Sequence, residues 1–114
     1  MMENCLFCKI SRGEIPSDKV YENEYVYAFR DINPQAPTHV LVIPKKHYTS
    51  ITEIGEASDR EIAECLRAVE VIARQENLTG GCRIVSNSGS DACQSVPHLH
   101  FHILGGRKMA DSMA

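Results

Sequence analysis

The sequence predicts an α+β fold, in which one long helix covers a five-stranded antiparallel sheet and a short helix lies near the N-terminus. Five short segments carry the β-branched and aromatic residues typical of strands, and residues that favour turns separate them. One longer segment, from Ser58 to Gln75, has apolar residues at helical spacing. Because 114 residues suffice for one hydrophobic core, we expect a single domain over residues 1–114.

The first part of the chain is expected to form the short helix and three strands. Phe7–Arg12 would make a helical turn that ends before a glycine. Val20–Glu22 and Tyr25–Arg30 would pair as a hairpin. A third strand is expected over His39–Ile43, after a segment in which two prolines prevent regular structure.

The second part is expected to form the long helix and two further strands. Ser58 and Glu61 have the spacing of a capping box, which predicts a helix that begins there and runs to about Gln75. Strands are expected over Cys82–Ser86 and His98–Leu104. Helical spacing predicts the buried stripe of the helix, which consists of Ile62, Leu66, Val69, Ile72 and Ala73.

Composition and charge bear on partners and compartment. The net charge of −3 argues against a nucleic-acid polymer as partner, because proteins that bind one usually carry a basic surface. The longest apolar stretch, Val40–Ile43, is too short to cross a membrane, and no signal-peptide pattern precedes it. Five cysteines are an odd number, which favours reduced thiols over a disulfide framework. We therefore expect a cytoplasmic protein without a membrane partner.

Three of the five histidines alternate with apolar residues near the end of the chain. On a strand, His98, His100 and His102 would share one face at a spacing of about 6.6 Å. Imidazole is rarely buried in apolar strands, so this pattern indicates a functional site. The residues that would face the core instead are Leu99, Phe101 and Ile103.

The histidine cluster could be a polar surface, a metal site or a site of nucleophilic catalysis by an imidazole. The preceding loop, Asn87–Ser95, is rich in small hydrogen-bonding residues that can direct N–H groups and hydroxyls at phosphate oxygens. No Asp or Glu lies between Ala92 and Gly106 to support a metal ion held by three histidines. The pattern therefore favours phosphorus chemistry.

Two further features have a structural and a functional interpretation. Cys5 and Cys8 form a Cys-x-x-Cys pair, which could hold zinc or act in redox chemistry, and zinc would need two more ligands. Cys65 and Cys82 are both expected to be small buried hydrophobic residues. His39 is either a structural histidine or a residue that steadies the catalytic face.

Four segments together resemble one protein family. His98–Leu104 matches the histidine-triad (HIT) motif, in which histidines alternate with hydrophobic residues. Pro34–His47, Asn87–Asp91 and Gln94–Val96 resemble the corresponding segments of the Hint branch. The resemblance covers nearly the whole chain, from Phe7 to Arg107. It implies the HIT-like fold and a homodimer whose two sheets join into one.

The resemblance also implies an activity. Hint proteins are purine-nucleotide-binding hydrolases that cleave nucleoside 5′-phosphoramidates and related AMP and GMP conjugates through a nucleotidyl-histidine intermediate, without an organic cofactor. By matching position, His100 resembles the nucleophile, His102 the neighbouring phosphate-site residue, and Ser95 the group beside the leaving nitrogen. The matching contacts to sugar and phosphate are Asp31, Ile32, Asn87, Cys93 and Gln94, and those of the purine slot are Phe7, Ile10, Ile15, Phe29 and Leu41.

The chain also resembles bacterial triad proteins that carry structural zinc. On that analogy, the ligands are Cys5, Cys8, His47 and His98, so that only His100 and His102 of the triad would face the phosphate. The chain departs from the Hint pattern at two points. Cys93 stands where the branch usually has glycine, and the C-terminal tail lacks the tryptophan-and-proline ending of animal members.

Other functions remain open on the same framework. A dinucleoside polyphosphate hydrolase would be closer to the Fhit branch, and a nucleotidyl transferase would typically carry glutamine in place of His102. A nucleotide-binding interaction module with vestigial activity is the alternative from another class. Histidine at position 102 favours hydrolysis.

Overall fold

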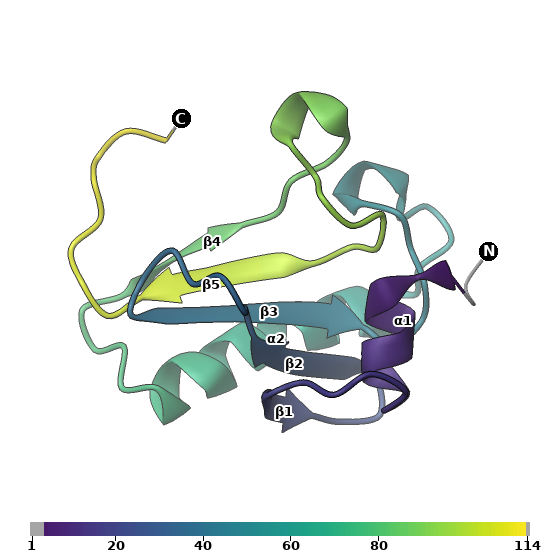
Figure 1. The fold of residues 1–114 in the computed structure, drawn as a ribbon, viewed down its shortest axis with the longest axis horizontal. Coiled ribbons are helices and arrows are strands. Elements are labelled where there is room, and N and C mark those ends of the chain that lie inside the picture. The colour runs from purple at the N-terminus through teal and green to yellow at the C-terminus, as the bar shows by residue number, and fades with distance from the viewer. Residues whose placement is uncertain (1–3, 114) are drawn as a thin grey trace.

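The computed structural model describes residues 4–113 and shows the predicted α+β fold (Figure 1). Its single sheet is antiparallel throughout, with the strand order β1-β2-β3-β5-β4. The strands are β1 (Lys19–Glu22), β2 (Val26–Arg30), β3 (Thr38–Pro44), β4 (Cys82–Val85) and β5 (Phe101–Gly105). The α-helices are α1 (Leu6–Ser11) and α2 (Asp59–Gln75), and short 3₁₀ turns lie at Ile51–Glu53 and Ser90–Ala92.

The helix α2 has the predicted bounds because its capping box forms. The Ser58 hydroxyl accepts from the Glu61 N–H at 3.0 Å, and the Glu61 carboxylate accepts from the Ser58 N–H at 2.8 Å. The buried residues of α2 are Cys65, Ala68 and Ile72, so the prediction for Cys65 is confirmed. The prediction for Leu66 is wrong, because it lies about 100° around the helix from Cys65 and is 53% exposed.

The last strand begins later than the histidine pattern predicts. The pairing of β5 with β3 ends at Phe101, which lies opposite Val42. By the same register, His100 would lie opposite Ile43 and Leu99 opposite Pro44, and Pro44 has no N–H to donate to the ladder. His98 and Leu99 instead bond to main-chain carbonyls of Val96 and Tyr48, at 2.8 and 2.6 Å. The prediction of a strand over His98–Leu104 is therefore wrong for its first three residues.

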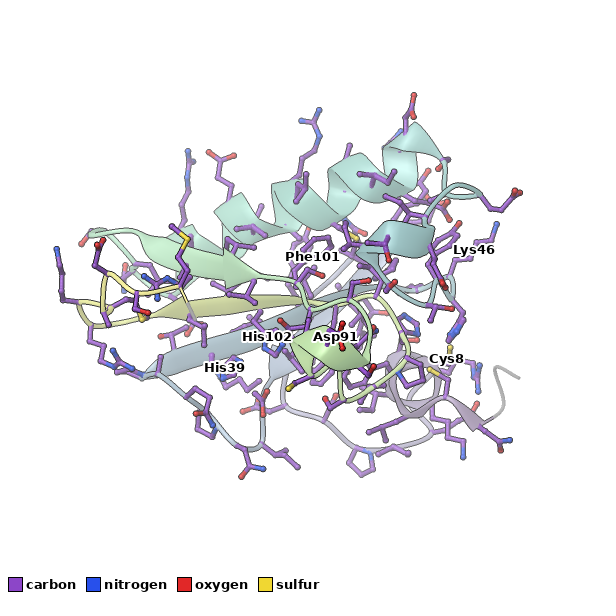
Figure 2. The ribbon with its side chains drawn as sticks, turned by 90° about the horizontal axis from the view of Figure 1, so that it is seen from above. Cys8, His39, Lys46, Asp91, Phe101 and His102 are labelled. Carbon is purple, nitrogen blue, oxygen red and sulfur yellow. The ribbon has the colours of Figure 1, made fainter. Side chains whose placement is uncertain are left out.

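The sheet separates two apolar layers (Figure 2). The face that α2 covers, here called the helix face, carries Val26, Ala28, Val40, Val42, Leu99, Phe101 and Ile103, which pack with Cys65, Ala68 and Ile72. The opposite face, here called the histidine face, carries Tyr27, Phe29, Leu41 and Ile43, which pack with α1. This alternation confirms that Leu99, Phe101 and Ile103 belong to the core.

The strand β4 forms one edge of the sheet, which changes the environment of its residues. Cys82 is exposed there, so the prediction that it is buried is wrong. Among the described residues, no helix is long and apolar enough to span a membrane.

Candidate active site and metal centre

The triad histidines gather on the histidine face, next to His39 of β3. Figure 2 shows His39 and His102 on the side of the sheet away from α2, whereas Phe101 points towards α2. The rings of His100 and His102 lie 5.1 Å apart between centroids, and those of His39 and His102 are equally close. His98 and His100 are buried, and His102 is half-buried.

The main chain fixes the ring of His100. Its Nδ1 lies 2.7 Å from the carbonyl oxygen of His98. Because a carbonyl only accepts, Nδ1 carries the proton and Nε2 keeps a lone pair. The ring of Phe7 meets that of His100 edge-on, with centroids 5.1 Å apart and planes at 90°. Both contacts orient the imidazole, and in its neutral form the lone pair that a nucleophile requires is on Nε2.

A second chain of hydrogen bonds fixes the ring of His102. The main-chain N–H of Gln35 donates to Nδ1 of His39 at 3.0 Å, so Nε2 of His39 carries a proton. That nitrogen donates to Nδ1 of His102 at 2.8 Å. His102 therefore holds its own proton on Nε2, where it can be donated to an oxygen of a ligand.

Burial favours the neutral forms of His39 and His102. It lowers the pKa of His102 to about 4, with His100 and His39 contributing in the same direction. Burial also lowers the pKa of His39, although the Asp31 carboxylate, 3.5 Å from its Nε2, opposes this shift. At neutral pH, His102 is thus a neutral N–H donor.

Asp31, His39 and His102 lie close enough to hold a metal ion, since their ligand atoms lie within 4.8 Å of one another. A metal bound to Nε2 of His39 would require the ring proton to be on Nδ1. Nδ1 already accepts a hydrogen bond from the Gln35 N–H, so it cannot carry that proton. The hydrogen-bonded chain is therefore favoured over a metal at this position.

A second cluster has the donor set and the geometry for zinc. Cys5, Cys8, His47 and His98 place their ligand atoms within 4.8 Å of one another. Nε2 of His98 donates to the carbonyl of Pro44 at 2.9 Å, so its Nδ1 lone pair faces the two thiols, at 3.3 and 3.5 Å. Nδ1 of His47 lies 3.4 Å from Sγ of Cys8. Two thiols and two imidazoles favour zinc over harder cations.

The pKa values of this cluster reflect its burial. Burial lowers the pKa of His98 to about 4, so its ring is neutral at pH 7, as a metal ligand must be. Burial and the neighbouring Cys5 raise the pKa of the Cys8 thiol to about 11. Zinc would therefore displace a proton when it binds Cys8.

The residues that match the purine slot lie together. Phe7, Ile10, Phe29 and Leu41 are buried in one apolar cluster of the histidine face, and Ile15 packs against it. The rings of Phe7 and Phe29 meet edge-to-face at 5.5 Å. Phe7 links this cluster to His100, so an apolar surface adjoins the histidines.

The residues that match the sugar contacts lie after β2. The Asp31 carboxylate accepts from the N–H of Asn33 at 2.8 Å and is half-buried. Ile32 is 94% exposed, which is unusual for a large apolar side chain and suits a residue that covers a ligand.

The loop before β5 has a defined conformation. Gln94 braces it, because its amide accepts from the Gly89 N–H at 2.8 Å and donates to the carbonyls of Thr49 and Val96, at 2.7 and 3.0 Å. Asn87 is half-buried, and Cys93 and Ser95 are exposed. Cys93 has φ = 61°, in the left-handed region that favours glycine.

Sequence reasoning missed the main-chain groups that set the site. The Gln35 N–H and the carbonyls of Pro44 and His98 fix three imidazole tautomers, and no side-chain pattern reveals them. It also missed Ser86, whose hydroxyl donates to the carbonyl of His100 at 2.7 Å. Ser86 follows β4 directly, and its place beside His100 follows only from strand pairing.

Comparisons with known proteins define the family. The family model described as the HIT domain matches residues 12–109. The chain therefore belongs to the histidine-triad (HIT) family, and the resemblance seen in its sequence is confirmed.

Curated relatives cover the chain almost completely. It is 51% identical to the 14 kDa zinc-binding protein of Zea mays, over 91% of this chain and 83% of that protein. It is 39% identical to the purine nucleoside phosphoramidase of Escherichia coli K12, over 100% of this chain and 97% of that protein. The adenylylsulfatase HINT1 of Arabidopsis thaliana is 46% identical, over 91% of this chain and 72% of that protein.

Solved structures confirm the fold. A HIT family hydrolase from Clostridium thermocellum has a TM-score of 0.95 and 42% identity, and each chain is covered completely. A histidine triad protein from Clostridium difficile has a TM-score of 0.88 and 46% identity, with 96% of each chain covered. The arrangement of the five strands and two helices is therefore that of the family.

Proposed function

We propose that this protein is a purine nucleoside phosphoramidase, which cleaves nucleoside 5′-phosphoramidates and related AMP and GMP conjugates. The observation that carries the proposal is the pair of opposite tautomers in the triad. The contacts of His100 favour the neutral tautomer with its lone pair on Nε2, and those of His102 favour the tautomer with its proton on Nε2. A nucleophile next to a neutral hydrogen-bond donor suits attack at phosphorus with stabilisation of a phosphoryl oxygen. The named activity of the Escherichia coli relative supports the same reaction.

The proposed reaction has two steps. Nε2 of His100 attacks the α-phosphorus, and the bond between phosphorus and the amine nitrogen breaks as that nitrogen receives a proton. Ser95, three residues before the triad, is the proposed source of this proton. Water then attacks the nucleotidyl-histidine and gives a proton back to Ser95, which releases the nucleoside monophosphate and restores His100. His98 supports the first step because its carbonyl accepts from Nδ1 of His100 and stabilises the positive charge that develops on the ring.

The remaining matched residues would bind the nucleotide. Asp31 would accept hydrogen bonds from the ribose hydroxyls, and the exposed Ile32 would lie against the sugar. The apolar cluster around Phe7 would hold the purine. Asn87, Cys93 and Gln94 would shape the loop that faces the phosphate. His39 would act through His102, whose tautomer it sets.

The cysteine–histidine cluster is proposed as a structural zinc site. Zinc bound by Cys5, Cys8, His47 and His98 would contribute to stability by joining α1 to the segments around β3 and β5. The zinc-binding name of the Zea mays relative supports this assignment. We also propose a homodimer, and the free edge of β4 is where a second sheet could pair.

Intact-protein mass spectrometry tests the proposed function. The protein is mixed with an adenosine 5′-phosphoramidate for a short time and quenched at alkaline pH, where a histidine–phosphorus bond survives. We expect a mass increase of one adenylyl group in the wild type and release of AMP and free amine. AMP offered alone is the control for non-covalent binding.

The other candidate functions predict different outcomes. A dinucleoside polyphosphate hydrolase would form the adduct faster from a diadenosine polyphosphate than from the phosphoramidate. Nucleotide binding with neither adduct nor turnover on either substrate would overturn the proposal in favour of an interaction module.

A further inference from the structure

The proposed nucleophile stands outside the hydrogen-bonded ladder of the sheet. The pairing between β3 and β5 ends at Phe101, so His100 lies one residue before the first paired position. The strand therefore does not determine how the ring of His100 is oriented. Its position depends on the contacts of the segment His98–His100, and several of these contacts lead to the metal cluster.

His98 is the first of two links between the cluster and the nucleophile. Its ring directs Nδ1 at Cys5 and Cys8 and anchors Nε2 on Pro44, and the residue is completely buried. Its carbonyl accepts the proton of His100 Nδ1 at 2.7 Å. A metal bound to the ring would fix the plane of this residue, and with it the acceptor that selects the tautomer of His100.

Phe7 is the second link. It lies between Cys5 and Cys8 in α1, and its ring contacts both His98 and His100, with centroids 6.0 and 5.1 Å away. A helix of six residues is too short to be stable alone. In α1, the Cys5 sulfur accepts from the Cys8 N–H at 3.4 Å, and a metal bound to both sulfurs would hold this turn, and Phe7, against His100.

We propose that occupancy of the cysteine–histidine cluster positions the nucleophile, so that the metal centre controls turnover as well as stability. His98 is the positioning residue, and Phe7 supports the same ring from the other side. This inference rests on the proposed function for its kinetic consequence, whereas its structural consequence is independent of it. Two buried connections, one through a carbonyl and one through an aromatic ring, join the two sites.

The first experiment compares zinc-loaded protein with protein stripped by a chelator. Nitrogen-15 NMR of the imidazoles reports the tautomer of His100, which we expect to be only the Nδ1–H form with zinc and a mixture of forms without it. On a phosphoramidate, kcat is expected to fall about 10- to 100-fold without zinc, the range typical for loss of an orienting partner. Zinc added back should restore both the Nδ1–H form of His100 and the original kcat.

Variants separate the two links. Cys8→Ser removes a ligand, and Cys82→Ser, which changes an exposed cysteine of β4 outside the site, is the matched control. We expect the altered His100 signal in the first variant only. Phe7→Leu keeps all four ligands, so its zinc content should equal that of the wild type while the His100 signal changes.

The outcomes distinguish this inference from the proposed function. An identical His100 signal and kcat in folded protein with and without zinc would overturn the coupling and leave the phosphoramidase proposal intact. A zinc-dependent His100 signal in a protein that cleaves no phosphoramidate would support the coupling and reject the function. If stripped protein unfolds, the folded Cys8→Ser variant decides, because it weakens the metal site at one ligand. A His100 signal identical to that of the wild type, in this variant with less than one zinc per chain, would overturn the coupling.

Discussion

The two faces of the sheet divide stability and chemistry between them. The helix face packs against the 17 residues of α2, and its buried cluster is apolar except for Tyr48. The histidine face is covered in part by the six residues of α1 and carries the imidazoles and two buried thiols. Long, regular packing on one side permits a short helix and buried polar groups on the other.

The separation depends on the period of the strands. In β5, Phe101 and Ile103 belong to the cluster of the helix face, and Figure 2 shows His102, which lies between them in the sequence, on the other side of the sheet. A shift of the register by one residue would place imidazole in the apolar core, so the helix face also specifies the register of the site.

The largest expected effect is on the histidine face. His100→Ala removes the proposed nucleophile, so kcat on a phosphoramidate should fall on the order of 10⁴- to 10⁶-fold. Nucleotide affinity should change little, because ground-state binding and catalysis are separable. Single-turnover kinetics and calorimetric titration with AMP measure the two quantities. A variant with near-wild-type kcat would show that another group attacks phosphorus.

Ser95→Ala should have the next largest effect, and only for some substrates. If Ser95 protonates the leaving amine, cleavage of phosphoramidates with poor amine leaving groups should slow about 100- to 10,000-fold. An acyl adenylate, whose leaving group needs no proton, should be cleaved at nearly the wild-type rate. Equal losses on both substrates, measured as kcat/KM, would mean that Ser95 only binds phosphate.

The opposite result is expected on the helix face. Ile72 is completely buried between α2 and the sheet, so Ile72→Ala should lower the free energy of unfolding by about 2–5 kcal/mol. The folded fraction should keep its kcat, because Ile72 packs in the cluster of the helix face, on the other side of the sheet from the histidines. Urea denaturation and activity at low temperature test this pair of results. If Ile72→Ala lowered kcat and left the free energy of unfolding unchanged, the two faces of the sheet would not divide stability and chemistry between them.

The smallest effect concerns pH. The pKa of His102 is about 4 in the folded protein, below the 6.5 of a free histidine side chain. Between pH 4 and pH 6.5, the unfolded chain therefore binds a proton at this residue more readily than the folded protein does. This contribution to stability is complete above pH 6.5 and is lost as the pH falls towards 4. Denaturation at pH 7 and pH 5 should therefore show a steeper decline for the wild type than for His102→Gln. Parallel declines would mean that His102 is not neutral in the fold.

Local signals allowed most of the fold to be predicted from sequence. The helix α2 was predicted with its correct bounds because Ser58 and Glu61 carry the start signal within one turn. The first three residues of the predicted last strand failed because Pro44, more than fifty positions away, ends the ladder on the neighbouring strand. The prediction that Leu66 is buried was wrong, because helical spacing alone fits several possible buried stripes, and packing against the sheet selects one of them.

The side chains of the site could be predicted from the sequence, but the positions of the protons on its imidazole rings could not. Alternation identified His100 and His102, and the resemblance supplied His47 as a partner of Cys5 and Cys8, which the structure brings within ligand distance. The tautomers depend on main-chain groups whose positions exist only after folding. This is why the sequence could not distinguish a structural role of His39 from one that steadies the catalytic face.

The bond from the Gln35 N–H to His39 has a consequence for how this protein can evolve. The bond uses the main chain, so selection on the reaction leaves the side chain at position 35 free to drift. Only proline is excluded at position 35, because it has no N–H to donate to Nδ1 of His39. Without that bond, nothing keeps the ring proton of His39 on Nε2, where it is donated to His102. A collection of descendants would show position 35 as variable, and its importance would be visible only as one amino acid that never occurs there.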